Sequence, residues 1–334
     1  MTNANESNST LLYASNARRL LRGAALTAAL SLALVACKKA DDAPTAATEV
    51  NIEAGAEEPS QNEAVDTSRI VSLNGTVTEI LVELGLKDSI AGVDISSTYP
   101  PEMTQLPNVG YYRQLSDEGI LGVSPSLIIG EHEAGPRPVM RRLRAAGVDM
   151  ALIRVEVSEE GILQRIRDVA KAVALEEEGA ALEARFTSAL EEAKADPGLP
   201  ADQKPRILGV YARGAGLSMV GGTDTPFDVV IRMAGGVNAA EKLTGFQPLS
   251  PEALAISNAD IILIPEGGLA ALGGEDGLLA FPGMTQTPAG KKRQILVYDD
   301  LLVTGLGPRL PQLITTMRAD IAEMLGEETK EKAE

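Results

Sequence analysis

An internal repeat constrains the fold of this chain more than any other feature. Residues 116–129 align without gaps with residues 250–263, and each copy has a serine, a glutamate two positions later and a following apolar run. Serine is a favoured N-cap and carboxylates are favoured in a first helical turn, so both copies predict a capped short helix, a turn and a buried strand. Two copies of this unit predict two similar lobes with a cleft between them.

Short apolar runs alternate with helical patterns in both halves of the chain, and this alternation predicts an α/β fold with mostly parallel sheets. In such sheets ligands gather at the carboxyl ends of the strands. Thr76 and Glu79 have the spacing of a capping box, so we expect Thr76 to cap the first helix. The expected strands are residues 69–73, 89–94, 126–130, 149–155, 206–211, 260–264 and 294–298, and the expected helices include 76–84, 136–146, 225–234 and 308–325.

A long stretch with helical spacing separates the two halves. Residues 158–195 contain only two glycines and no proline, which predicts one or two long helices with a break near Leu175. Between two lobes such a segment acts as a stiff connector. The expected organisation is a signal peptide (1–36), a tether (37–67), a first lobe (68–158), a connecting helix region (159–200), a second lobe (201–326) and a charged tail (327–334).

The amino-terminal segment has the pattern of an exported protein. Three arginines precede an apolar run at residues 24–36, which is followed by Cys37. This pattern is typical of a secretory signal peptide, and the run is shorter than the ~20 residues of a spanning helix. Residues 34–37, Leu-Val-Ala-Cys, resemble a bacterial lipobox, which implies that Cys37 carries a lipid that anchors the protein to the membrane. An ordinary signal peptide with an incidental cysteine is the alternative. The following segment has almost no large apolar side chains, which predicts a disordered tether.

The composition excludes several function classes. A net charge of −17 is unfavourable for nucleic-acid binding, because contacts with phosphates need a basic face. Cys37 and His132 are the single cysteine and the single histidine, so neither an intrachain disulfide nor a zinc site of several Cys or His ligands can form. The glycines at 214–216 and 221–222 match no nucleotide-binding motif and predict turns that line the cleft. We therefore expect a binding protein; an α/β enzyme and a purely structural lipoprotein are the alternatives.

Motifs distributed over residues 68–326 carry a family resemblance. They are Arg69-Ile70-Val71, Thr78-Glu79, Tyr99-Pro100-Pro101, and residues 110–116, 118–121, 134–136, 283–289 and 305–309. Through them the chain resembles haem-binding substrate-binding proteins of bacterial haem-uptake ABC transporters, in the helix-linked (class III) periplasmic binding protein group. The resemblance implies an extracytoplasmic monomer that delivers haem to a permease dimer with its ATPase, for iron transport. Because the strand–helix pattern is shared with other members, a binder of a ferric siderophore or cobalamin is the alternative.

Residues 110–116, Gly-Tyr-Tyr-Arg-Gln-Leu-Ser, are the most specific signal for haem. The resemblance implies that Tyr111 is the axial ligand of haem iron, and a phenolate is a hard donor that favours Fe(III). Arg113 can hydrogen-bond to this phenolate or stabilise it electrostatically. Tyr112 is expected to form a pocket wall. His132 is a candidate second ligand, with a rim or solvent-facing position as the alternative, and the alternative for Tyr111 is a half-buried loop ring.

The resemblance also implies roles for four charged residues. Glu118 and Glu252 match a pair of glutamates, one per lobe, that dock on arginines of the permease. The alternative is the ordinary preference for carboxylates in a first helical turn. Arg213 and Arg309 are candidates for binding the haem propionates, because two carboxylates favour cations at the pocket edge. Packing or solvent-facing positions are the alternatives for these two arginines.

Overall fold

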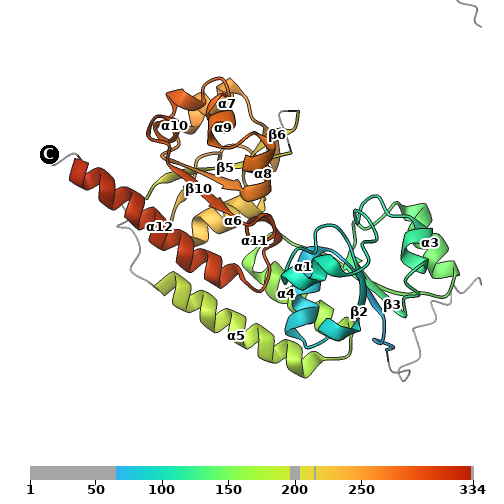
Figure 1. Ribbon diagram of the computed structural model, residues 1–334. Coiled ribbons are helices and arrows are strands. Elements are labelled where there is room, and N and C mark those ends of the chain that lie inside the picture. Colours follow the sequence, from blue (N-terminus) through green and yellow to red (C-terminus); the bar gives the residue numbers. More distant parts are fainter. Residues whose placement is uncertain (1–64, 196–203, 214–215, 332–334) are drawn as a thin grey trace, which may run out of the picture. The chain divides into compact units, whose positions relative to one another are not determined.

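The computed structural model describes residues 65–195, 204–213 and 216–331, with the backbone alone for 327–331. The predicted signal peptide, Cys37, most of the tether, and Gly214 and Ala215 lie outside these residues. The described chain forms two α/β lobes, each built on its own sheet (Figure 1). The predicted fold class is therefore confirmed.

The first lobe is built on a four-stranded parallel sheet with the order β2-β1-β3-β4. One face of the sheet packs on α1 and on α4 (Glu159–Ala172), through Ile70 and Ile129, and the other packs on α2 and α3, through Val71 and Ile128. Helices on both faces explain why these strands are continuous apolar runs in the sequence. The elements are β1 (Ile70–Leu73), α1 (Gly75–Glu83), β2 (Ile90–Val93), α2 (Asp117–Leu121), β3 (Leu127–Glu131), α3 (Arg137–Ala145) and β4 (Asp149–Ile153).

The predicted capping box at the start of α1 was wrong. The N-cap is Asn74, whose side-chain oxygen accepts hydrogen bonds from the backbone amides of Thr76 (2.8 Å) and Val77 (3.4 Å). Thr76 lies inside the first turn, and its hydroxyl donates to the carbonyl of Gly305 at 3.0 Å. Asn and Thr are both good N-caps, so local sequence alone does not choose between them. With Asn74 as the N-cap, Thr76 lies where its hydroxyl contacts Gly305 of the distant second lobe.

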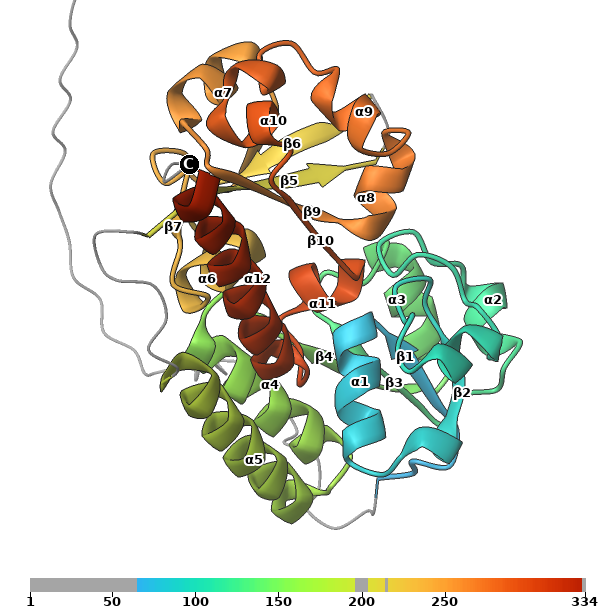
Figure 2. The same ribbon diagram turned by 60° about the vertical axis from the view of Figure 1, so that its left-hand side comes forward.

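Two packed helices, α4 (Glu159–Ala172) and α5 (Glu176–Ala195), connect the lobes, with the break where it was expected. Lys194 near the end of α5 forms an ion pair with Glu159 at the start of α4 (2.7 Å), so the two helices run antiparallel. The closing helix α12 (Leu310–Glu331) packs along α5 and continues beyond its expected end at residue 325 (Figure 2). No helix in the described ranges has both the length and the apolar character needed to cross a bilayer.

The second lobe has a mixed sheet with the order β10-β9-β5-β6-β8, and β7 pairs with β5. β5, β7, β9 and β10 are parallel, whereas β6 pairs antiparallel with β5, and β8 pairs antiparallel with β6. Gly221, predicted to lie in a turn, is the last residue of β6. The strands are β5 (Arg206–Ala212), β6 (Ser218–Gly221), β7 (Val237–Asn238), β8 (Phe246–Pro248), β9 (Ile261–Pro265) and β10 (Ile295–Tyr298). The helices are α6 (Pro226–Met233), α7 (Pro251–Ser257), α8 (Glu266–Ala271), α9 (Glu275–Leu279), α10 (Pro288–Lys292) and α11 (Asp300–Gly305).

The internal repeat has the structure that its sequence predicts. The hydroxyl of Ser116 accepts from the amide of Gly119 at the start of α2 (3.1 Å), and the hydroxyl of Ser250 accepts from the amide of Ala253 at the start of α7 (3.2 Å). Each helix is followed by a buried strand, β3 or β9. The repeat therefore places one equivalent helix start on each lobe.

Candidate functional site

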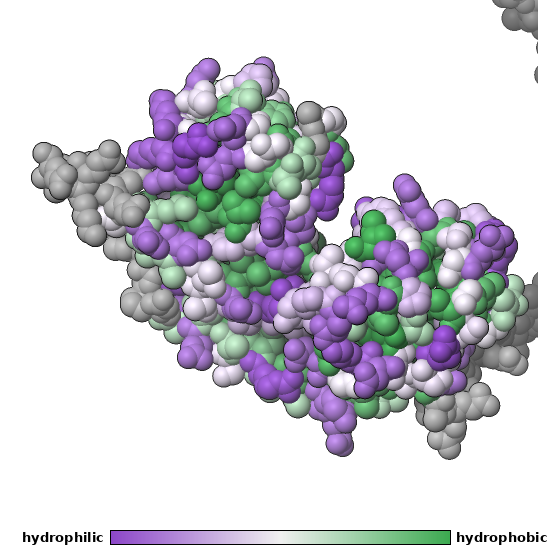
Figure 3. Space-filling model, in the orientation of Figure 1, coloured by the Kyte–Doolittle hydropathy of each residue, from purple (hydrophilic) through white to green (hydrophobic). Residues whose placement is uncertain are grey.

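A cavity of about 700 Å³ lies between the two lobes. The molecular surface is visibly hollowed there (Figure 3). Its volume is within the range of roughly 300–1,000 Å³ that is usual for small-molecule pockets. Asn74, Glu131 and Tyr211 line it where β1, β3 and β5 end, so it occupies the carboxyl edges of both sheets, as ligand sites in such sheets do.

Tyr111 and Tyr112 lie side by side in the cavity wall contributed by the first lobe. Their ring centroids are 4.9 Å apart with the rings edge to face. Backbone hydrogen bonds hold the loop, since Tyr112 accepts from Gly135 and Gly135 accepts from Leu115, each at 2.8 Å. Tyr111 is 36% exposed and Tyr112 only 8%, and burial raises the pKa of Tyr112. Tyr111 is thus the phenol of this pair that a ligand can reach.

Arg113 and His132 complete this wall. The Arg113 guanidinium lies 5.2 Å from the ring centroid of Tyr112 and forms an ion pair with Glu133. Arg113 thus stacks on the neighbouring ring, Tyr112, instead of on Tyr111. His132 is exposed, and its backbone amide donates to the carbonyl of Ile153 at 2.8 Å. The four residues predicted for the first lobe therefore share one face of the cavity.

Tyr211 and Arg213 supply a corresponding pair from the second lobe. Both line the same cavity, and the Arg213 guanidinium lies 4.8 Å from the ring centroid of Tyr211. Arg213 also forms an ion pair with Asp300 at 3.0 Å. Arg213 was predicted from the sequence but Tyr211 was missed, although the Tyr-x-Arg spacing of residues 211–213 repeats that of residues 111–113. That repeated spacing was the available signal.

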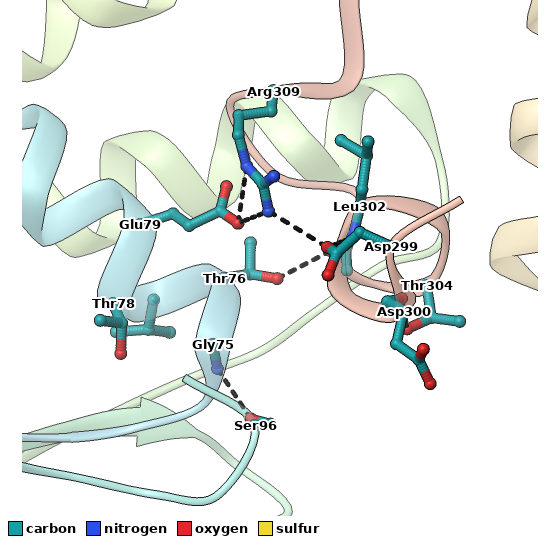
Figure 4. Close-up of polar contacts among 12 residues, drawn as sticks. Gly75, Thr76, Thr78, Glu79, Ser96, Asp299, Asp300, Leu302, Thr304 and Arg309 are labelled. Carbon is teal, nitrogen blue, oxygen red and sulfur yellow. Dashed lines mark hydrogen bonds and ion pairs between the residues drawn. The ribbon is translucent and has the colours of Figure 1, made fainter. Parts of the chain in front are cut away.

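Arg309 lies at the junction of the lobes and is not among the residues that line the cavity. Its Nε donates to Oε1 of Glu79 at 3.1 Å (Figure 4). Its guanidinium also stacks 3.6 Å from the ring centroid of Tyr99. Burial raises the pKa of Glu79, while the hydrogen bond and charge of Arg309 act in the opposite direction. In this structure Arg309 packs at the junction of the lobes, and propionate binding by Arg309 stays a prediction.

Glu118 and Glu252 are exposed at the starts of α2 and α7, outside the cavity lining. Neither forms an ion pair with another described residue, whereas the neighbouring Asp117 is paired with Arg142 at 2.5 Å. Hydrogen bonds from its own backbone amide and from Ser250 lower the pKa of Glu252. Each lobe thus presents one charged carboxylate to solvent at equivalent positions of the repeat.

Arg165 of α4 is a further cavity residue that the sequence interpretation missed. It lies on the buried face of its helix and is 3% exposed. The only sign in the sequence that Arg165 is buried was its position, because it is a charged residue where the amphipathic pattern of α4 has apolar residues. In the described part of the chain, no group of three or more His, Cys, Asp or Glu side chains is arranged to hold a metal ion.

Comparisons with known proteins agree on one family. Residues 70–302 match the family profile described as periplasmic binding protein. Among solved structures, the periplasmic haem-binding protein RhuT from Roseiflexus sp. RS-1 superposes with a TM-score of 0.73 at 41% identity, over 77% of this chain and 98% of that one. An uncharacterised ABC transporter substrate-binding lipoprotein of Bacillus subtilis is 26% identical over 73% of this chain and 77% of its own length.

A third relative has a different named ligand. The cobalamin-binding protein of Halobacterium salinarum is 26% identical over 59% of this chain. The match covers 54% of that protein, so the chain spans about half the length of this relative.

Proposed function

This chain belongs to the periplasmic binding protein family, and we propose from this membership and from its cavity that it binds haem outside the cytoplasm and delivers it to an ABC permease. Its two α/β lobes with a helical connector have the class III form of that family. The proposal concerns binding and transfer, since the proteins of this family are components of transport systems.

The observation that carries the haem proposal is the pair of Tyr-x-Arg segments that meet across one cavity. Tyr111 with Arg113 comes from the first lobe and Tyr211 with Arg213 from the second. A phenolate oxygen is an established haem ligand and favours Fe(III). An arginine near a phenol stabilises the phenolate form by its charge. The site therefore offers hard oxygen ligands and cations to a ferric porphyrin that carries carboxylates.

Within this site we assign Tyr111 as the axial ligand, because it is the accessible phenol of the first lobe. Tyr112 forms a wall against which Tyr111 and Arg113 pack. Tyr211 offers a second phenol from the opposite lobe, and His132 remains an alternative second donor on the same wall as Tyr111. Arg213 faces the cavity and is assigned to a ligand carboxylate, whereas Arg309 is assigned to the junction of the lobes.

Cobalamin is the second candidate ligand, because one relative is named as a cobalamin-binding protein. Titrating the full-length protein with hemin and, separately, with cyanocobalamin distinguishes the two by visible absorption. We expect saturable hemin binding with a shifted Soret band and no saturable response to cyanocobalamin. The reverse result would replace haem by cobalamin as the ligand.

We further propose that Cys37 carries the lipid and that residues 38–66 tether the binding lobes to the membrane. Replacing this single cysteine (Cys37→Ser) should move the protein from the membrane fraction to the soluble extracytoplasmic fraction. Retention of the variant in the membrane fraction would exclude a lipid at this position.

Glu118 and Glu252 are proposed to dock on basic residues of the permease, one from each lobe. Because both lie outside the cavity, replacing both by alanine should leave hemin binding unchanged. The same change should abolish stimulation of the transporter's ATPase by the haem-loaded protein. Full stimulation by the double variant would assign docking to another surface.

A further inference from the structure

Arg165 is a buried cation with incomplete hydrogen bonding in the cavity wall. Its Nη1 donates to the carbonyl of Gly305 at 2.8 Å, whereas its Nε is buried and has no hydrogen-bond partner. The carboxylate nearest to it is Glu131, with Nη1 and Oε1 separated by 3.9 Å. Buried polar groups in folded proteins are nearly always satisfied, so an orphaned donor on a buried charge calls for a physical explanation.

The ion pair between Arg165 and Glu131 does not supply that explanation. At 3.9 Å it is longer than a charge-assisted hydrogen bond, which is about 2.7–2.9 Å. Burial lowers the pKa of Arg165, and burial also raises the pKa of Glu131, so each charge is only partly compensated by the other. The pair leaves guanidinium donors available for a stronger acceptor.

The other two arginines that line the cavity in the described residues differ from Arg165. Arg113 and Arg213 have side chains that are 49% and 48% exposed, and each forms a close ion pair with a surface carboxylate. A water-exposed arginine that is already paired gains less from binding an additional anion than a buried arginine does, so the contribution of Arg213 to carboxylate binding is the smaller one. Arg165 is 3% exposed, so a hydrogen bond from it is formed away from water and is correspondingly stronger.

The residues that line the cavity together with Arg165 suit a ligand that is apolar and carries an acid group. Val155, Val157 and Leu306 line the cavity together with Arg165, and the hydroxyl-bearing Thr304 lines it as well. A cavity that has apolar side chains and a single buried cation in its lining suits a flat apolar molecule that carries a carboxylate at its edge. The Gly305 carbonyl fixes the guanidinium from the second lobe, which holds the remaining donors in place.

We propose that Arg165 binds a carboxylate group of the ligand in this recess, and that the incoming carboxylate displaces Glu131 as its partner. This assignment rests on the proposed function, in which the ligand is a ferric porphyrin with two propionates. Arg165 is then the residue that makes the protein bind porphyrins with free carboxylates more tightly than porphyrins whose acid groups are blocked.

The test compares hemin with hemin dimethyl ester, which has the same ring and iron but no free carboxylate. Full-length wild-type protein and the Arg165→Gln variant are titrated with both ligands by visible absorption. Arg141→Gln is the matched control, because Arg141 is an exposed arginine of α3 outside the cavity lining. Thermal unfolding of each variant reports whether it is folded.

Wild type should bind hemin at least about 10-fold more tightly than the ester, because a hydrogen bond to a buried charged group is worth about one to two powers of ten in affinity. Arg165→Gln should remove most of this preference by weakening hemin binding, and Arg141→Gln should keep it. Equal affinity of wild type for the two ligands, or a preference that persists in Arg165→Gln, overturns the assignment. Absence of hemin binding in wild type instead overturns the proposed function itself.

Glu131→Gln provides a second test that does not depend on folding of the arginine variant. Removing the competing carboxylate should increase the preference for hemin over the ester, because Arg165 is then freed from its weak partner. A decrease in that preference would contradict displacement of Glu131 by the ligand.

Discussion

The ion pair between Arg309 and Glu79 gives the sharpest prediction about stability. The Glu79 side chain is 4% exposed and the Arg309 side chain 17%, so the pair is largely removed from water. Replacing Arg309 by methionine keeps most of the stacking volume against Tyr99 but leaves a buried carboxylate without its cation. Removing one partner of a buried pair typically costs about 3–5 kcal/mol of unfolding free energy. We expect a loss of this size for Arg309→Met at pH 7.5.

The pH dependence of this loss follows from Glu79. Burial already raises the pKa of Glu79, and Arg309 opposes that rise. Without Arg309 the pKa of Glu79 in the folded state rises further above its unfolded value of about 4.3. The folded variant then binds a proton more tightly than its unfolded chain, so its stability falls as pH increases through the interval between the two pKa values. The destabilisation should therefore be smaller at pH 5 than at pH 7.5.

Urea unfolding followed by circular dichroism at both pH values measures these free energies. The double variant Glu79→Gln/Arg309→Met should recover most of the loss, because it removes the uncompensated charge. Arg142→Met is the matched control: it breaks the Arg142–Asp117 pair, whose side chains are 55% and 29% exposed, and should cost about 0–1 kcal/mol. A loss below about 1 kcal/mol for Arg309→Met, or no recovery in the double variant, would refute this reasoning.

Three further changes test other parts of the fold. Asn74→Ala removes the N-cap of α1 and should lower the unfolding free energy by about 0.5–2 kcal/mol, measured by urea unfolding; a smaller loss would mean that water replaces the cap. Gly130→Ala places a Cβ 2.7 Å from both the Cβ and the carbonyl oxygen of Leu73 on the paired strand. This crowding should lower the unfolding free energy by about 1–3 kcal/mol. An unchanged melting temperature would show that β1 and β3 can move apart without cost. Because burial raises the pKa of Glu131, the contribution of Glu131 to stability should decrease as pH rises above about 4.3. Glu131→Gln should therefore lose less stability than wild type over this pH interval, and parallel pH–stability curves would contradict this.

Locally determined features were the ones that the sequence could predict. Ser116 and Ser250 cap their helices through amides three residues away, a contact that depends only on nearby sequence. The apolar runs of β3 and β9 and the break before Glu176 are local in the same sense. The predictions of these elements were correct because spacing and residue type are sufficient to specify them.

Features that depend on distant contacts were not predictable in this way. Thr76 and Glu79 have a capping-box spacing, yet their side chains bind Gly305 and Arg309, which are more than two hundred residues away in sequence. Arg165 occupies an apolar position in the pattern of α4, but the local sequence does not indicate that the fold buries its charge beside Gly305. Tyr211 differs from these, since its spacing to Arg213 repeats that of Tyr111 to Arg113 and was visible in the sequence.

The most direct test of the central claim is the spectrum of the protein with bound hemin. Visible absorption and resonance Raman spectra are recorded for wild type, for Tyr111→Phe, and for Tyr298→Phe as a control tyrosine that lies outside the cavity lining. We predict a high-spin Fe(III)–phenolate spectrum with its charge-transfer band in wild type and in the control, and its loss in Tyr111→Phe. An unchanged phenolate spectrum in Tyr111→Phe would contradict the assignment of Tyr111 as the axial ligand.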